Sequence, residues 1–264
     1  DDDMIIVGYV GANIDENSGP LNVSATSSLT YENYTDNTFS DQFYFNLGAE
    51  AGWEMLGNRL KWQARDYFTQ RLTDSIDADT PDNIENVNIF TFGPIITLPI
   101  SALHTLTINP AFSDFYYEDS DIGNQRYSLL LDWTYQAFSN MAIGLGGGVA
   151  KTDFEKENQN PNYTGSNIHV IVSGQRARSI YNVNLGATHV DRDRFENQNG
   201  ITGSLDWKLD LTGHSNARIF LGSELTDSSN TSLNSAIDPG RGDIDNVQIS
   251  GDVIRSSILR GEYQ

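Results

Sequence analysis

The histidines are the residues in this sequence best suited to acid–base or metal chemistry: His104, His169, His189 and His214. No two of them stand three to five residues apart, the usual spacing of paired histidine ligands on one element. The chain has no cysteine, so disulfides, thiolate metal sites and cysteine nucleophiles are excluded. No Gly-x-Ser-x-Gly segment offers an activated serine, and nothing in the sequence places a base beside a nucleophile. We therefore expect no enzymatic activity.

Two polar segments are rich in carboxylates, whose oxygens are the ligands that Ca²⁺ prefers. The first contains Asp74, Asp77, Asp79, Asp82 and Glu85, and the second contains Asp238, Asp243 and Asp245. Neither continues into an EF-hand loop with its central glycine and terminal glutamate. We interpret both as a solvated acidic rim and expect neither a bound metal nor another cofactor.

The charge balance excludes one large class of partner. The chain of 264 residues carries 36 acidic and 16 basic residues, for a net charge of −20. Nucleic acid is an unsuitable partner, because phosphate binding requires a clustered positive field. The sequence contains no run of 18 apolar residues that could form a transmembrane helix. The composition does not exclude a membrane β-barrel, because the inward half and the loops of such a barrel are polar.

Alternation of apolar and polar residues with a period of two is the strongest pattern in the chain. In the segment Phe43–Met55 every odd-numbered residue is apolar, whereas most even-numbered residues are polar or glycine. Similar alternation recurs at 127–135, 141–149, 181–187 and 201–211. Successive side chains of a strand point to opposite faces, so each segment predicts a strand with one apolar face. Such lengths suit tilted membrane strands of about 9–11 residues.

The connections between these segments alternate between short and long. Short ones follow residues 55, 98, 137, 173 and 211, and long polar ones cover 32–42, 73–86, 118–124, 151–167, 191–200 and 226–246. This alternation is typical of an up-and-down antiparallel β-barrel, which has tight turns at one rim and loops at the other. We predict about twelve transmembrane strands, or more if the chain is truncated.

A turn at Gly57 and Asn58 allows the register of one hairpin to be worked out. It pairs Glu54 with Lys61 and Glu50 with Arg65 on the polar face. On the apolar face it pairs Trp53 with Trp62. Tryptophans near short turns favour an aromatic girdle at the membrane interface. We assign this role to Trp53, Trp62, Trp133 and Trp207.

Asp66 conflicts with this register, because it falls on the apolar face, where a carboxylate would contact lipid at high cost. A β-bulge near Arg65 and Asp66 would turn it inward. Asp114 presents the same conflict between a carboxylate and an apolar face.

The polar face predicts the lining of a lumen, with charges of both signs rather than a basic ladder. The candidate residues are Glu50, Glu54, Lys61, Arg65, Arg126, Asp132, Asp206, Lys208 and Arg218. Such a mixture suits internal ion-pair networks and a polar channel equally well. Glycine and asparagine at inward positions leave room for a narrow aqueous passage.

The segment Ser28–Phe39 and the late segment Asp252–Leu259, followed by Tyr263, resemble segments of the PEP-CTERM-associated outer-membrane β-barrel proteins. These proteins are encoded with exopolysaccharide export systems, so the resemblance implies a barrel that passes or anchors secreted polysaccharide. It brings no catalytic residues. Members of that family are usually longer and end on an aromatic residue, which implies that this chain is truncated.

Together these observations predict a short periplasmic segment over residues 1–20 and a β-barrel over 21–264 in a Gram-negative outer membrane. We expect a porin-like, passive polar channel or export pore for exopolysaccharide or another hydrophilic solute. Its partners would be lipid, the solute and a periplasmic export protein. A structural or adhesive barrel plugged by its loops, or a secreted soluble all-β binding protein, are the alternatives. Outer-membrane phospholipases with a serine–histidine dyad on the outer wall keep an enzyme conceivable, but no motif supports one.

Overall fold

The computed structural model describes residues 4–74, 77–78, 80–212, 215–226 and 254–263. The described residues form thirteen strands and one short 3₁₀ helix, η1 (Pro81–Asn83). The strands are β1 (Ile5–Ser18), β2 (Leu21–Tyr34), β3 (Gln42–Met55), β4 (Leu60–Leu72), β5 (Ile84–Pro99), β6 (His104–Tyr117), β7 (Asn124–Phe138), β8 (Met141–Phe154), β9 (Tyr163–Arg176), β10 (Ser179–Arg192), β11 (Gln198–Thr212), β12 (Ser215–Thr226) and β13 (Ile254–Tyr263). Among these residues, no helix is long and apolar enough to cross a membrane.

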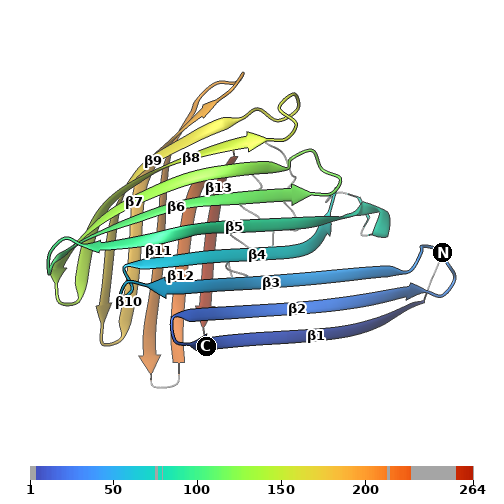
Figure 1. The fold of residues 1–264 in the computed structure, drawn as a ribbon, viewed down its shortest axis with the longest axis horizontal. Helices are drawn as coiled ribbons and strands as arrows, with labels where there is room; N and C mark the ends of the chain where they lie inside the picture. The colour runs from blue at the N-terminus through green and yellow to red at the C-terminus, as the bar shows by residue number, and fades with distance from the viewer. Residues whose placement is uncertain (1–3, 75–76, 79, 213–214, 227–253, 264) are drawn as a thin grey trace.

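Every strand pairs antiparallel with its neighbours in the sequence, in one continuous sheet ordered from β1 to β13. The sheet curls back on itself, so that β10–β13 pass behind the strands at the front (Figure 1). This is the up-and-down antiparallel all-β architecture that the alternating pattern predicts. In the described part of the chain, β1 and β13 form the two edges of the sheet.

Short and long connections lie at opposite ends of the strands, as the sequence predicts. The described turns cover 19–20, 56–59, 100–103, 139–140 and 177–178, and the described loops include 35–41, 118–123, 155–162 and 193–197. Leu56, Gly57 and Asn58 all have positive φ angles, between 54° and 64°, which suits a tight hairpin. The pairing of Trp53 with Trp62 confirms the predicted register of this hairpin.

The prediction for residues 1–20 is wrong. Residues 5–18 are the first strand of the sheet, so the described residues contain one strand more than the predicted twelve. The first strand also begins at the loop end, whereas a periplasmic segment before the barrel would begin at the end with the short turns. The backbone N–H of Thr35 donates to the carbonyl of Met4 over 3.1 Å, which places Met4 at the loop end of the strands.

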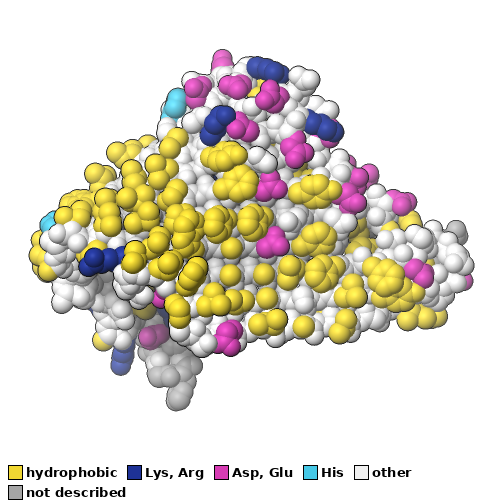
Figure 2. All heavy atoms as spheres, in the orientation of Figure 1, with side chains coloured by type: hydrophobic (Ala, Val, Ile, Leu, Met, Phe, Trp, Pro, Cys, Tyr) yellow, Lys and Arg dark blue, Asp and Glu magenta, His cyan; other side chains and the backbone are white. Residues whose placement is uncertain are grey.

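The two faces of the sheet differ in chemistry. The convex face carries large exposed side chains such as Phe43, Leu131, Trp133, Leu185 and Ile201. Figure 2 shows hydrophobic side chains covering much of this face, with acidic side chains mainly toward the loop end. The concave face carries polar residues, together with a small buried cluster near the loops. The wall is therefore apolar outside and mainly polar inside.

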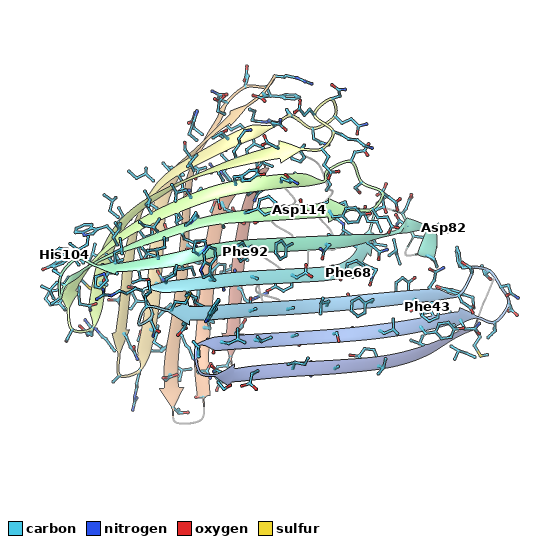
Figure 3. The ribbon with its side chains drawn as sticks, in the orientation of Figure 1. Phe43, Phe68, Asp82, Phe92, His104 and Asp114 are labelled. Atoms are coloured by element: carbon cyan, nitrogen blue, oxygen red, sulfur yellow. The ribbon has the colours of Figure 1, made fainter. Side chains whose placement is uncertain are left out.

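Asp66 and Asp114 remain on the convex face, because the predicted bulge is absent. The described β3–β4 and β4–β5 ladders run through Asp66 without a shift in register. Asp66 and Asp114 stand on either side of Phe90. Figure 3 shows Asp114 on the same face as Phe68 and Phe92. One carboxylate oxygen of Asp66 is buried there without a hydrogen-bond partner.

Replacing Asp66 with leucine should therefore stabilise the protein if this face contacts lipid. We expect Asp66→Leu to raise the free energy of unfolding in lipid vesicles by about 1 kcal/mol, measured by denaturant titration. Asp82→Leu is the matched control, because Asp82 is exposed in η1 and its replacement should change stability little. A loss of stability in Asp66→Leu would show that this carboxylate is required where it stands.

Candidate functional site

All the residues predicted to line a lumen lie on the concave face, but they form separate groups along the wall. Near the turn end of β3 and β4, Arg65 Nε lies 3.0 Å from Glu50 Oε1, and Lys61 Nζ lies 4.0 Å from Glu54 Oε1. The hydroxyl of Tyr67 also donates to Glu50, over 2.9 Å. This group contributes no net charge, because each base faces an acid across the hairpin.

A second group lines a cavity of about 390 Å³ at the turn end of β10–β13. The guanidinium of Arg218 donates to both oxygens of Asp206, over 2.9 and 2.8 Å. Lys208 and Glu262 line the same cavity, with the amides of Asn182 and Asn216. The cavity therefore offers a small polar solute both positively charged hydrogen-bond donors and negatively charged acceptors.

The third group is an Asp132–His169 pair in the middle of the wall. His169 Nε2 lies 2.8 Å from Asp132 Oδ1, and Nδ1 lies 3.1 Å from Asn167 Oδ1. The residue is only 9% exposed. Gly146 of β8 lies between Asp132 on β7 and His169 on β9, and a Cβ there would overlap Asp132 Oδ1. The glycine thus makes the direct contact between β7 and β9 possible.

Arg126 lies apart from these groups, in a buried cluster under the loops. Its guanidinium donates to Thr152 and to Tyr163, and it stacks over the ring of Phe115 at 5.1 Å. The cluster is the main apolar region of the concave face, and its members are Val87, Ile89, Phe115, Tyr117, Ile122, Phe154, Tyr163 and Val190. Ile122 belongs to the loop after β6, so this loop folds over the concave face instead of extending away from the strands.

Glu85 holds that loop in place. Its side chain is fully buried, and one oxygen accepts the backbone N–H groups of Asp119 and Ser120 over 3.1 and 2.9 Å. The other oxygen accepts the Ser120 hydroxyl over 2.6 Å and lies 3.8 Å from Arg71 Nε. The acidic-rim interpretation is thus wrong for Glu85, which points inward. Asp79, Asp238, Asp243 and Asp245 lie outside the described residues, as does His214.

A second contact joins this loop to the next one. Lys156 pairs with Asp121, and the amide of Asn160 donates to the Asp121 carbonyl over 2.6 Å. The hydrogen bond from the Lys156 ammonium holds the pKa of the Asp121 carboxyl below its usual range. Within the described ranges, no group of three or more histidine, aspartate or glutamate side chains is arranged to hold a metal ion.

The tryptophans predicted to face the membrane interface all lie on the convex face. Trp53 is 51% exposed, and Trp62 stacks on Phe92 at 5.2 Å. Trp133 stacks on His104, and Trp207 donates to the Ser179 hydroxyl over 2.8 Å. His104 and Ser179 begin β6 and β10, which places both of these tryptophans close to the short turns.

Sequence reasoning missed the roles of His169, Glu85, Asn167 and Glu262. The alternation places His169 on the polar face, and the glycines at 144, 146 and 148 signal that something bulky fills the space beside β8. Pairing His169 with Asp132 requires the register across β7, β8 and β9, which no short segment specifies. Glu85 resembled a loop acid because it directly follows an acidic segment.

Comparison with known proteins gives weak structural likenesses to outer-membrane proteins. No family model and no curated protein matches the chain. The ferric-catecholate import receptor Fiu from Escherichia coli K12, in its closed form, is 8% identical, with a TM-score of 0.45 over 87% of this chain. The chain spans 51% of that receptor. OmpT, an outer membrane protein of Vibrio cholerae, is 11% identical, with a TM-score of 0.39 over 87% of this chain and 92% of its own.

Gly146→Ala should disrupt the Asp132–His169 pair. The added Cβ would overlap both side chains, so we expect the free energy of unfolding to fall by about 1–3 kcal/mol. Gly165→Ala is the matched control, because the nearest atom to its Cβ would be 4.0 Å away. Equal stability of the two variants in denaturant titrations would contradict the arrangement.

Lys156→Ala should raise the pKa of Asp121 toward its ordinary value of 3.8, because the ammonium that stabilises the carboxylate is lost. The contact is fully present above that value and is lost as the pH falls through the lower pKa of the folded protein. Carboxyl-carbon NMR titration measures both values. An identical Asp121 titration in the variant would show that the two loops are not joined in this way.

Proposed function

We propose that the chain forms the wall of a bacterial outer-membrane β-barrel with a polar passage for small hydrophilic solutes, constricted near its loops. The observation that carries this proposal is the two-faced wall: large apolar side chains lie outside, and charge pairs beside a cavity of about 390 Å³ lie inside.

The membrane setting follows from the cost of exposing the convex face to water. Each large side chain there would gain about 1.5–3 kcal/mol on full transfer out of water. Strands can cross lipid only when their backbone groups are paired, and the continuous ladders of this sheet provide that pairing over most of its width. Up-and-down barrels of this kind belong to bacterial outer membranes.

The chemistry of the concave face suits the passage of a neutral polar solute better than selective passage of cations or of anions. The described acids and bases of this face largely neutralise each other in ion pairs, so within the described strands they form no long positive or negative ladder that would select for charge. The loop carrying Ile122 narrows the loop end, which favours small solutes over wide polymers. A link to exopolysaccharide export, and to a periplasmic export partner, stays a prediction.

Conductance in planar lipid bilayers tests the proposal. We expect small, stable channels, and a shift of the reversal potential toward cation selectivity when Lys61→Glu or Arg65→Glu adds negative charge to the lining. Asp82→Lys serves as a control for charge at the loop rim. Unchanged reversal potentials in both lining variants would remove Lys61 and Arg65 from the passage.

Releasing the loop should widen the passage. Glu85→Ala removes the acceptor of the Asp119 and Ser120 amides, so we expect a larger single-channel conductance. Glu85→Gln keeps one carbonyl oxygen and should change conductance less. Absence of conductance in the wild type and in Glu85→Ala would favour the plugged adhesive barrel instead.

A further inference from the structure

The cavity of about 390 Å³ at the turn end of β10–β13 contains two charges of opposite sign that do not pair with each other. Among the residues that the structure describes, the ammonium of Lys208 on β11 has no ion-pair or hydrogen-bond partner. Glu262 on β13 faces Arg260 only at 3.8 Å, from Oε1 to Nε, which is too long for a hydrogen bond. The cavity therefore offers a free cation and a weakly paired anion to the same polar space.

The Arg218–Asp206 ion pair keeps these two charges apart. Lys208 stands directly opposite Arg218 in the β11–β12 ladder, and Arg218 stands directly opposite Glu262 in the β12–β13 ladder. The backbones of Lys208 and Glu262 are therefore two strand spacings apart, or about 10 Å. The guanidinium between them donates to both oxygens of Asp206, over 2.9 and 2.8 Å, and such a two-point contact fixes its orientation. Lys208 and Glu262 thus face the cavity from opposite sides of a fixed ion pair.

The charges of this cavity match a solute that is neutral overall but carries both signs. Two bases and two acids line it, so its charges balance. An anion or a cation alone would match one of the two available charges and leave the other without a partner. A solute with separated charges of both signs matches the two at once. The side-chain amides of Asn182 and Asn216, which make no hydrogen bond to another described side chain, add further donors and acceptors.

We propose that this cavity is a binding site for small zwitterions that carry an ammonium and a carboxylate, such as amino acids and short peptides. The Lys208 ammonium donates to the carboxylate of the solute, and the Glu262 carboxylate accepts from its ammonium. The assignment rests on the passage proposed above and names the class of solute that this passage takes at its turn end.

The size and the exposure of the cavity suit weak binding of a small solute. Sites for small ligands occupy about 300–1,000 Å³, and about 390 Å³ lies near the lower limit. An amino acid or a dipeptide therefore fills the site better than a larger solute. The side chains of Asp206 and Arg218 are each 38% exposed, so water competes for the contacts in the cavity. Weak binding is what a passage requires, because a bound solute must also leave.

Ligand-observed NMR titration of the purified full chain in detergent micelles tests the proposal with three probes. Glycylglycine carries both charges at neutral pH, N-acetylglycine carries only the carboxylate, and glycinamide carries only the ammonium. We expect glycylglycine to bind about tenfold more tightly than either of the other two probes, because one charged hydrogen bond is worth about that factor. Glycylglycine that binds no more tightly than the single-charge probes, or that does not bind, would overturn the proposal.

Two variants test the two contacts individually. Lys208→Met should weaken the binding of glycylglycine and N-acetylglycine about tenfold and leave that of glycinamide unchanged. Glu262→Gln should weaken the binding of glycylglycine and glycinamide about tenfold and leave that of N-acetylglycine unchanged. Lys151→Met is the matched control, because Lys151 pairs with Asp153 and stands opposite Tyr127 on the convex face. It should bind all three probes as the wild type does.

The pattern of losses distinguishes binding from a structural role. Wild-type affinities in both variants, or an equal loss for all three probes, would overturn the two contacts. Lys208→Arg keeps the cation and should retain the binding of N-acetylglycine. Folding of each variant is checked by its heat-dependent shift on an SDS gel, and the three-probe comparison on the wild type does not depend on the folding of any variant.

Conductance, measured separately, distinguishes failure of this site from failure of the passage. Channels that conduct but do not bind glycylglycine overturn the zwitterion site and leave the proposed passage intact. Binding with the expected pattern of losses, in a protein that does not conduct, supports the site and contradicts the passage.

Discussion

The antiparallel register of the strands is the constraint on which the rest of this structure depends. Because side chains alternate between faces, a slip of one residue in any ladder would exchange the apolar and polar faces of that strand. The hairpin at Gly57 and Asn58 sets this register between β3 and β4. The ion pairs on the concave face and the tryptophan pair on the convex face both follow from strands that keep this alignment.

The register also explains why glycine is concentrated on the concave side of β8. Gly146 lies between Asp132 and His169 in the sheet. Because it has no side chain, Asp132 and His169 contact each other directly across it and couple β7 to β9. At the loop end the same face becomes apolar, because bulky residues of β5, β6, β8, β9 and β10 pack with Ile122 beneath a loop held by Glu85. A polar middle and an apolar end are consistent with a passage that is narrow near its loops.

Much of this could be predicted from the sequence, because barrel strands report their faces locally. The Trp53–Trp62 pairing followed from two turn residues, and the charged lining followed from alternation. β1 was missed because both of its faces are apolar in its first half, where Ile5, Ile6 and Val7 are consecutive. Asp66 was expected to turn inward because the cost of a lipid-facing carboxylate was given more weight than an uninterrupted ladder. The contacts of Glu85 and His169 depend on residues distant in sequence, which no local pattern specifies.

The central claim is that one face of this wall meets lipid and the other meets water. The chain has no cysteine, so single cysteines can be introduced along β7 and labelled with nitroxides without background. Accessibility to oxygen, which partitions into lipid, should peak at 127, 129, 131 and 133, and accessibility to a water-soluble nickel complex should be higher at 128, 130 and 132. Equal access to the nickel complex at odd and even positions would contradict the account.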